Sequence, residues 1–187
     1  MRPKITIQKK KEGVTYFTDE LRNYAGIMAE IAIEIVELVL SILVCQIAGF
    51  VGSIFTVPSI PTWYKKLKKP SFAPPNRIFG PVWITLYTLM GISLYLILRE
   101  GLDNPQVQVG MGIFGAQLVL NVLWSFVFFG KKSLLGGLVA IVVLWVAILL
   151  TIISFLNVSQ LAGLLLVPYI LWSSFAAILN YSILKLN

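Results

Sequence analysis

The sequence predicts an all-α fold, an integral membrane bundle of five transmembrane helices. The composition is the first observation behind this prediction, since 58% of the 187 residues are hydrophobic and only 12% are charged. Soluble domains carry roughly 25% charged residues, about twice that share. The second observation is that the charges interrupt long uncharged runs at only a few points, and about 20 apolar residues are enough for one helix to cross a bilayer.

The spans follow one another along the chain with short connections. The first is expected to end before Pro58 and Pro61, because proline removes a helical hydrogen bond. Proline is tolerated in a first turn, as at Pro81 and Pro105. The last uncharged stretch, 133–184, is long enough for two spans, which its polar residues near position 158 divide. We predict spans at about 38–56, 78–98, 105–129, 133–156 and 161–184.

Residues 1–37 are predicted to form an N-terminal extension ahead of the membrane domain at 38–187. Thr18 followed by two acidic residues is typical of a helix start. Glutamates at 30, 34 and 37 share one helical face, and isoleucines at 27, 31 and 35 share another. These patterns predict one long helix over 19–55, amphipathic outside the bilayer and apolar within it. A separate interfacial helix is the alternative, and residues 1–17 are expected to be a flexible tail.

Basic residues predict the orientation in the membrane. The extension holds six bases and six acids, which cancel, whereas the other 150 residues hold nine bases and two acids. These bases lie in loops between apolar runs, which argues against a nucleic-acid partner. Because cytoplasmic loops are enriched in Lys and Arg, the 57–77 loop and the C terminus are expected in the cytoplasm and the N terminus outside. We expect the membrane to be that of a prokaryotic cell.

Cysteine and histidine usage restricts the chemistry. The chain has one cysteine, Cys45, so it forms no intramolecular disulfide, and it has no histidine. The usual ligand of zinc and haem and the usual general base are therefore missing. We expect no metal site and no required cofactor, and a metalloenzyme or a Ser-His-Asp hydrolase is disfavoured.

Polar and aromatic residues occur deep in the predicted spans. Three tryptophans lie at least six residues, about 8 Å, inside the nearest helix end: Trp83, Trp145 and Trp172. On the third span Gln117, Asn121 and Ser125 are spaced i, i+4, i+8 and share one face. Such a stripe indicates either helix–helix hydrogen bonds or a ligand pocket. The 62–76 segment, with three prolines, three aromatics and four lysines, predicts a rigid basic lid. Its lysines could equally attract anionic lipid headgroups.

Several of these segments together resemble the translocator protein family, also called the tryptophan-rich sensory proteins. The resemblance rests on the residues at 63–64, 69–76, 79–87 and 90–91, on Gln117–Ser125, and on Pro168–Ala176. It covers about 38–187. It implies a five-helix bundle, commonly a homodimer, with a pocket that opens towards the lid. It further implies binding of porphyrins, of isoquinoline carboxamides and benzodiazepines, and of sterols in mitochondrial members.

The resemblance also implies a set of site residues. The ligand-binding pocket would use Tyr64, Pro74, Trp83, Gln117, Asn121, Trp124, Trp172 and Ala176. Trp83 and Trp172 would be catalytic if the protein degrades porphyrin in light. A metal-free porphyrin is favoured over haem, because no histidine is present to bind the iron. The residues able to pair with propionates or lipid headgroups are Lys65, Lys66, Lys68, Lys69 and Arg77.

Two further patterns suggest contacts with a sterol and with a second copy. Leu179, Tyr181 and Lys185 fit a loose sterol motif, but an interfacial tyrosine and a snorkelling lysine explain them more simply. Gly112 and Ala116, with Gly115 beside them, form a small-xxx-small step that predicts a homodimer contact on the third span.

Three functions remain open at this point. The first is a porphyrin-binding membrane protein that senses, scavenges or delivers its ligand. The second is an enzyme that degrades porphyrin in light. The third is a transporter of lipids, sterols or other hydrophobic compounds, which is ranked last for two reasons. The spans show no Gly/Pro-interrupted pair of the kind that broken transporter helices have, and no carboxylate lies deep in a span.

Overall fold

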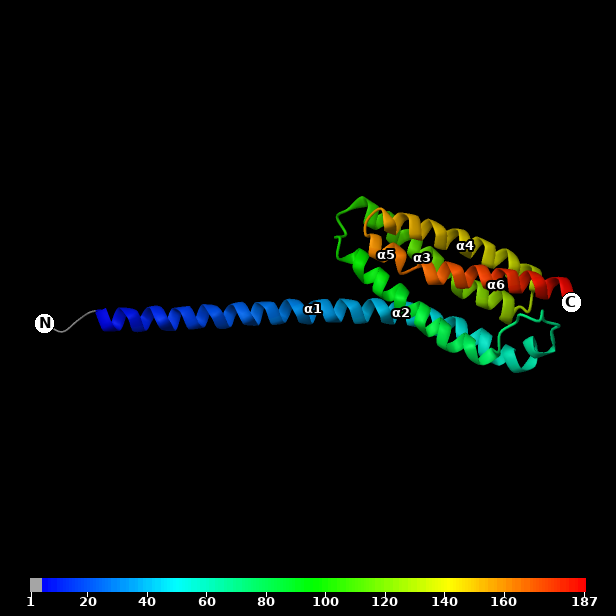
Figure 1. Ribbon diagram of the computed structural model, residues 1–187, viewed down its shortest axis with the longest axis horizontal. Coiled ribbons are helices and arrows are strands. Elements are labelled where there is room, and N and C mark those ends of the chain that lie inside the picture. Colours follow the sequence, from blue (N-terminus) through cyan, green and yellow to red (C-terminus); the bar gives the residue numbers. More distant parts are fainter. Residues whose placement is uncertain (1–4) are drawn as a thin grey trace. The chain divides into compact units, whose positions relative to one another are not determined.

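The computed structural model describes residues 5–187, with side chains from Glu20 onward. All regular structure in this part of the chain is helical (Figure 1), and five of its helical stretches are long and apolar enough to cross a membrane. The predicted all-α fold with five spans is thus confirmed. The chain divides into one unit that ends at Val39 and a second, Leu40–Asn187. The main helices are α1 (Ile5–Thr62), α2 (Phe79–Leu98), α3 (Pro105–Ser125), α4 (Leu134–Leu156), α5 (Gln160–Leu164) and α6 (Val167–Leu186).

Helix α1 is longer at both ends than predicted. It begins at Ile5, so residues 5–17 are helical and not the tail that we predicted; residues 1–4 lie outside the described residues. The run Gln-Lys-Lys-Lys-Glu at 8–12 consists of strong helix formers, which explains the early start. One continuous helix, and not a separate interfacial one, joins the extension to the first span.

Helix α1 also passes through Pro58 and Pro61, where we predicted its end. Each proline leaves the carbonyl four residues earlier, that of Ile54 or Val57, without its helical N–H, a loss that spanning helices tolerate. In the same turns the Thr62 hydroxyl donates to the Pro58 carbonyl at 2.8 Å. The Ser59 hydroxyl donates to the Phe129 carbonyl, also at 2.8 Å. The last turns of α1 are thereby joined to the end of the third span.

Two glycines let α1 and α2 approach each other closely. A Cβ atom on Gly91 of α2 would overlap the backbone of Ile42, and one on Gly49 of α1 would overlap the Tyr87 ring. The Gln46 amide adds two hydrogen bonds of 3.0 Å to α2. The membrane part of α1 is therefore held directly against α2.

The fifth span is interrupted, whereas we predicted one helix over 161–184. It consists of α5 and α6, and the break falls at Leu165 and Leu166. Pro168 explains the break, because it has no backbone N–H and its ring would clash with the carbonyl of Leu164 four residues earlier. One sequence argument against transport was that the spans show no Gly/Pro-interrupted pair, and this break interrupts one span only.

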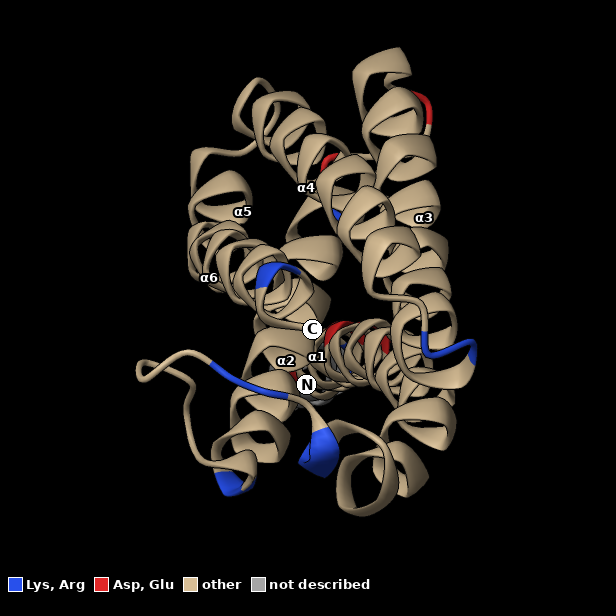
Figure 2. Cartoon of the chain, turned by 90° about the vertical axis from the view of Figure 1, so that its right-hand side faces the viewer, with Lys and Arg blue, Asp and Glu red and all other residues tan. Residues whose placement is uncertain are grey.

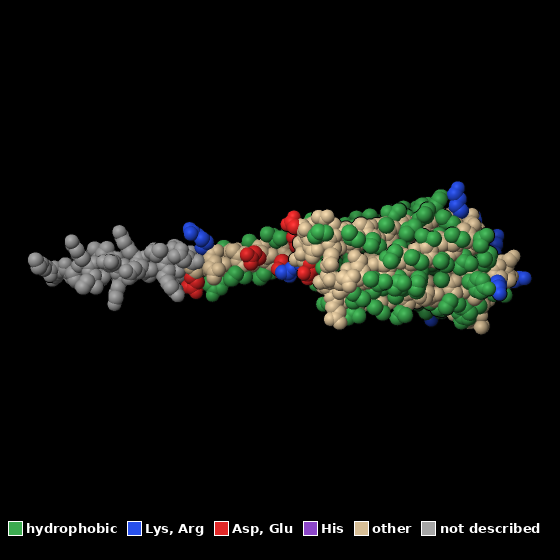
Figure 3. Space-filling model, turned by 90° about the horizontal axis from the view of Figure 1, so that it is seen from above, with side chains coloured by type: hydrophobic (Ala, Val, Ile, Leu, Met, Phe, Trp, Pro, Cys, Tyr) green, Lys and Arg blue, Asp and Glu red, His purple; other side chains and the backbone are tan. Residues whose placement is uncertain are grey.

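Charge is distributed as in a protein surrounded by lipid. Figure 2 shows lysine and arginine gathered at the end of the bundle where the lid and the C terminus lie, and Figure 3 shows a mainly hydrophobic flank. Large apolar side chains of the spans are exposed, such as Val119 on α3 and Leu171 on α6. Exposed apolar flanks between polar ends suit a bilayer environment.

Candidate ligand-binding site

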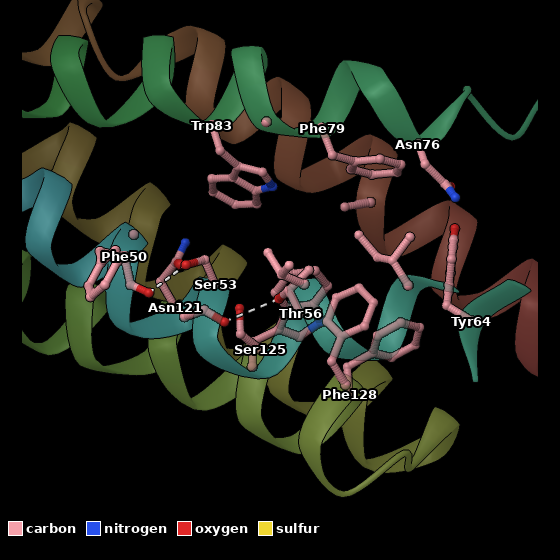
Figure 4. Close-up of a pocket in the computed structure, with 18 of the residues that line it drawn as sticks. Phe50, Ser53, Thr56, Tyr64, Asn76, Phe79, Trp83, Asn121, Ser125 and Phe128 are labelled. Atoms are coloured by element: carbon pink, nitrogen blue, oxygen red, sulfur yellow. Dashed lines mark hydrogen bonds between the residues drawn. The ribbon is translucent and has the colours of Figure 1, made fainter. Parts of the chain in front are cut away.

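A cavity of about 410 Å³ lies among α1, α2, α3 and α6, beneath the lid. Figure 4 shows side chains from these helices directed towards one space. The volume is in the range of small-molecule sites. Among the described residues that line the cavity none is charged. The lining includes Phe50, Ser53, Thr56, Tyr64, Asn76, Phe79, Trp83, Tyr87, Asn121, Trp124, Ser125, Phe128, Phe129, Ala176, Leu179, Asn180 and Ile183.

Aromatic rings form much of the cavity wall. The Trp83 ring stacks on Tyr87, with centroids 5.5 Å apart and an interplanar angle of 29°, and its centroid lies 6.3 Å from that of Trp124. Trp124 stacks in turn on Phe128 at 5.8 Å and 13°. Flat aromatic faces of this kind favour stacking with a flat, apolar ligand.

Two phenylalanines of this wall, Phe128 and Phe129, come from a π-helical turn, η3 (Phe126–Gly130), which ends the third span. Its wider winding is seen in the 2.8 Å hydrogen bond from the Lys131 N–H to the carbonyl of Phe126, five residues earlier. Phe128 and Phe129 are both buried and meet edge to face at 4.8 Å. π-helical turns occur often at functional sites. Hydropathy alone did not predict this one.

The lid places one lysine against the cavity wall. Tyr64, which lines the cavity, is buried, and the Lys69 ammonium lies 4.6 Å from the centre of its ring. Burial raises the pKa of Tyr64 and lowers the pKa of Lys69. Lys69 also donates to the Leu67 carbonyl at 3.2 Å. The other predicted bases are exposed and outside the lining: Lys65, Lys66, Lys68 and Arg77.

The polar residues on one face of α3 have different roles. Asn121 accepts a 2.6 Å hydrogen bond from the Tyr87 hydroxyl and donates one of 2.7 Å to the Tyr169 oxygen, so it joins α2, α3 and α6. It also lines the cavity, as does Ser125. Gln117 is buried, has no hydrogen-bond partner for either amide atom and lies outside the lining. Asn121 thus makes hydrogen bonds between helices and also lines the cavity, the two roles that the polar stripe was expected to have.

Two lining residues carry buried polar atoms without a partner. They are the Trp124 indole nitrogen and both amide atoms of Asn180. An unpaired buried polar group costs about 1–3 kcal/mol, so a ligand that pairs with these groups gains affinity. We did not predict Asn180 as a site residue. Its position four residues after Ala176, on the same helical face, was the signal available in the sequence.

Two other predicted residues, Pro74 and Trp172, lie outside the lining. Trp172 contacts the cavity-lining Phe79 ring at 6.0 Å and packs on Phe175 at 5.5 Å. Pro74 is half-buried in the lid. Of the eight predicted pocket residues, the lining therefore contains Tyr64, Trp83, Asn121, Trp124 and Ala176.

The residues of the sterol motif face different surroundings. Leu179 is buried in the cavity wall. Tyr181 is exposed, and the Lys185 ammonium lies 4.9 Å from the centre of its ring. The three side chains thus form no single surface.

The small residues of α3 lie on an open face. Gly112, Gly115 and Ala116 are exposed, and a Cβ atom added to either glycine would meet nothing within 4 Å. This face is accessible for close contact with another helix.

The fold and the cavity together define a class: an integral membrane protein of five spans with an internal aromatic cavity. Residues 41–186 match the TspO/MBR family. The chain belongs to this family, as the resemblance predicted. It is 47% identical to the Tryptophan-rich protein TspO of Chlorobaculum tepidum over 82% of this chain and 98% of that protein. It is 39% identical to Protein CrtK of Rhodobacter capsulatus, over 76% of this chain and 88% of that protein. Identity to the human Translocator protein is also 39%, over 74% and 82% respectively.

Proposed function

We propose that this protein binds a metal-free porphyrin in the cavity and thereby senses, scavenges or delivers it. The observation that carries the proposal is the combination of stacked aromatic rings with a lining that holds no charged residue among those described. A porphyrin is a flat aromatic ligand, so Trp83 and Trp124 offer it faces for stacking. Isoquinoline carboxamides and benzodiazepines are also largely apolar and carry aromatic rings.

The charged edge of the porphyrin limits how it can lie. A carboxylate in an uncharged, apolar cavity carries a large desolvation cost. We therefore propose that the propionates point to the lid, where Lys69 stands against Tyr64. The unpaired Asn180 amide and Trp124 N–H would meet polar atoms on the rest of the ligand.

A fluorescence titration with protoporphyrin IX tests the proposal. The protein in detergent is titrated in the dark, and the affinity of wild type is compared with those of Trp83→Ala and Phe128→Ala, which remove parts of the wall. We expect each to lose roughly tenfold or more in affinity, since a stacking partner contributes about 0.5–1.5 kcal/mol beyond its buried area. Trp145→Phe is the matched control, because Trp145 is hydrogen-bonded to Ser174 and lies outside the lining. Equal affinity in all four proteins would overturn the proposal.

Illumination of the same samples tests the alternative, a light-dependent porphyrin-degrading enzyme. A binder returns protoporphyrin unchanged, whereas an enzyme destroys its absorbance and loses this activity in Trp83→Phe. Loss of the same activity in Trp172→Phe would show that Trp172, which contacts the cavity-lining Phe79, is needed as well.

We also propose the setting in which the protein acts. The exposed Gly112 and Ala116 support a homodimer contact on α3. The basic end of the bundle supports a cytoplasmic lid and C terminus by the positive-inside rule. A prokaryotic cell membrane is supported by the similarity to the Chlorobaculum tepidum protein and, at 46% identity, to one of Archaeoglobus fulgidus.

A further inference from the structure

The unit that ends at Val39 lies ahead of the family match at 41–186, and the described lining of the cavity begins at Gln46, in the second unit. From Ile5 onward it is uninterrupted helix. Between Glu20 and Val39 large apolar side chains are exposed, among them Tyr24 at 59% and Met28 at 65%. Exposed apolar surface of this extent marks an interaction site.

The exposed apolar residues repeat with the period of a coiled coil. Five of them occupy the a and d positions of a heptad, at spacings of three and four: Leu21, Tyr24, Met28, Ile31 and Ile35. The half-buried Leu38 continues the series, whereas the exposed Ile27, Ile33, Val36 and Val39 lie at other heptad positions. In the sequence the same series continues backwards through Phe17, Val14 and Ile7, and Lys10 is the exception. The 32 residues from 7 to 38 make about four and a half heptads, more than the three to four that indicate a coiled coil. Because the helix rises 1.5 Å per residue, this seam is about 50 Å long.

The charges beside the seam are compatible with a second copy of the same helix. Glu20 and Glu34 occupy g positions, and in a parallel pair they lie opposite e positions of the partner copy, which are Ala25 and Val39. Among residues 20–39 no like charges therefore meet across a symmetric seam; further towards the N terminus Lys10, a d position, faces its own counterpart. The remaining described charges lie at b and c positions, away from it: Arg22, Glu30 and Glu37.

The same charges disfavour a membrane surface as the occupant. Helices that lie in the bilayer interface carry Lys and Arg on their polar face. Residues 20–39 hold four glutamates and one arginine, and the whole of 7–38 holds six acids and four bases, a net charge of −2. A net acidic segment is not attracted to an anionic lipid surface, whereas in a pair of copies the charges of residues 20–39 lie away from the seam or opposite uncharged e positions.

We propose that residues 7–38 pair with the same segment of a second copy as a parallel, in-register coiled coil. Two copies that cross one bilayer in the same orientation have the same residues at the same depth in the membrane. Their helices therefore pair in parallel and in register. Confinement to one membrane also raises their effective concentration. This inference does not depend on the proposed ligand or on the α3 contact.

Cysteine crosslinking of the full chain in lipid nanodiscs or vesicles tests the proposal. On a Cys45→Ser background, Tyr24→Cys and Met28→Cys introduce thiols on the seam, and Gly26→Cys and Ala29→Cys introduce them on the outer face. We expect disulfide-linked dimers to form at least tenfold faster at positions 24 and 28 than at 26 and 29. Equal rates at all four positions, or no dimer at any, would overturn the pairing.

A second pair of variants separates the seam from general effects on folding. Met28→Glu added to Tyr24→Cys should abolish crosslinking, while Ala29→Glu in its place should leave it unchanged. A loss in both variants would contradict the seam. Tyr24→Trp reports on the membrane alternative: quenching of its fluorescence by brominated lipids would show the segment on the bilayer and overturn the proposal.

Discussion

The side chain of Asn187 pairs with the backbone of Lys68 through two hydrogen bonds of 3.0 Å. Its Oδ1 accepts from the Lys68 N–H, and its Nδ2 donates to the Lys68 carbonyl. The same Nδ2 donates to the Ile183 carbonyl at 2.8 Å, and Ile183 lines the cavity. One amide thus fastens the lid to the end of α6, beside the cavity.

Removal of this amide should loosen the lid. In Asn187→Leu both hydrogen bonds to Lys68 are lost, and each contributes about 0.5–1.5 kcal/mol. We expect porphyrin to be released about 5- to 100-fold faster, as measured by stopped-flow fluorescence. Lys68→Ala is the matched control, because it keeps the backbone groups that Asn187 contacts, and its release rate should equal that of wild type. A normal rate in Asn187→Leu would show that the lid is held by other contacts.

Asn121 should be a stability residue as well as a cavity residue. Asn121→Leu leaves the hydroxyls of Tyr87 and Tyr169 without their partner, at about 1–3 kcal/mol for each buried group. Thermal unfolding in detergent should show a clear loss of stability. Adding Tyr87→Phe to Asn121→Leu should recover part of it, because one of the two orphaned hydroxyls is removed. No recovery in the double variant would contradict the hydrogen-bond explanation.

Gln117 should behave in the opposite way. Its amide is buried without a partner and lies outside the cavity lining. Gln117→Met keeps a similar volume and removes the unpaired amide, so we expect the free energy of unfolding to rise by about 1–3 kcal/mol. Porphyrin affinity should not change. A marked loss of affinity would instead place Gln117 in contact with the ligand.

Asn180 should contribute to affinity at the expense of stability. Asn180→Leu removes two unpaired atoms from the cavity wall, so the ligand-free protein should become more stable. A ligand that uses this amide should bind about tenfold more weakly, which corresponds to 1.4 kcal/mol. Ser173→Ala is the comparison, since Ser173 is also buried and unpaired on α6 but lies outside the lining. It should gain stability without a loss of affinity, and identical behaviour of the two variants would argue against a ligand contact at Asn180.

The prolines did not predict the ends of the helices consistently. The same residue type acted differently in different places: Pro58 and Pro61 lie within α1, whereas Pro168 accompanies the break between α5 and α6. The rule that proline ends a helix failed for the first two. In the structure, the helix continues through them, and hydroxyls of the same turns, Thr62 and Ser59, donate to the carbonyls of Pro58 and Phe129. Such partners come from the local turn and from the end of another span, and the proline itself does not reveal them.

The sequence by itself determined the all-α class, the five spans and the family. Hydropathy and charge are local properties, and a bilayer permits few other arrangements for long apolar segments. Only the tertiary structure decided which side chains meet. It placed Asn180 in the cavity wall and Trp172 outside the lining, in contact with the Phe79 ring. It also gave the Asn121 amide two tyrosine partners. These relations depend on the rotation and depth of helices that are far apart in the chain, because a buried polar group is paired or left unpaired only by what packs against it.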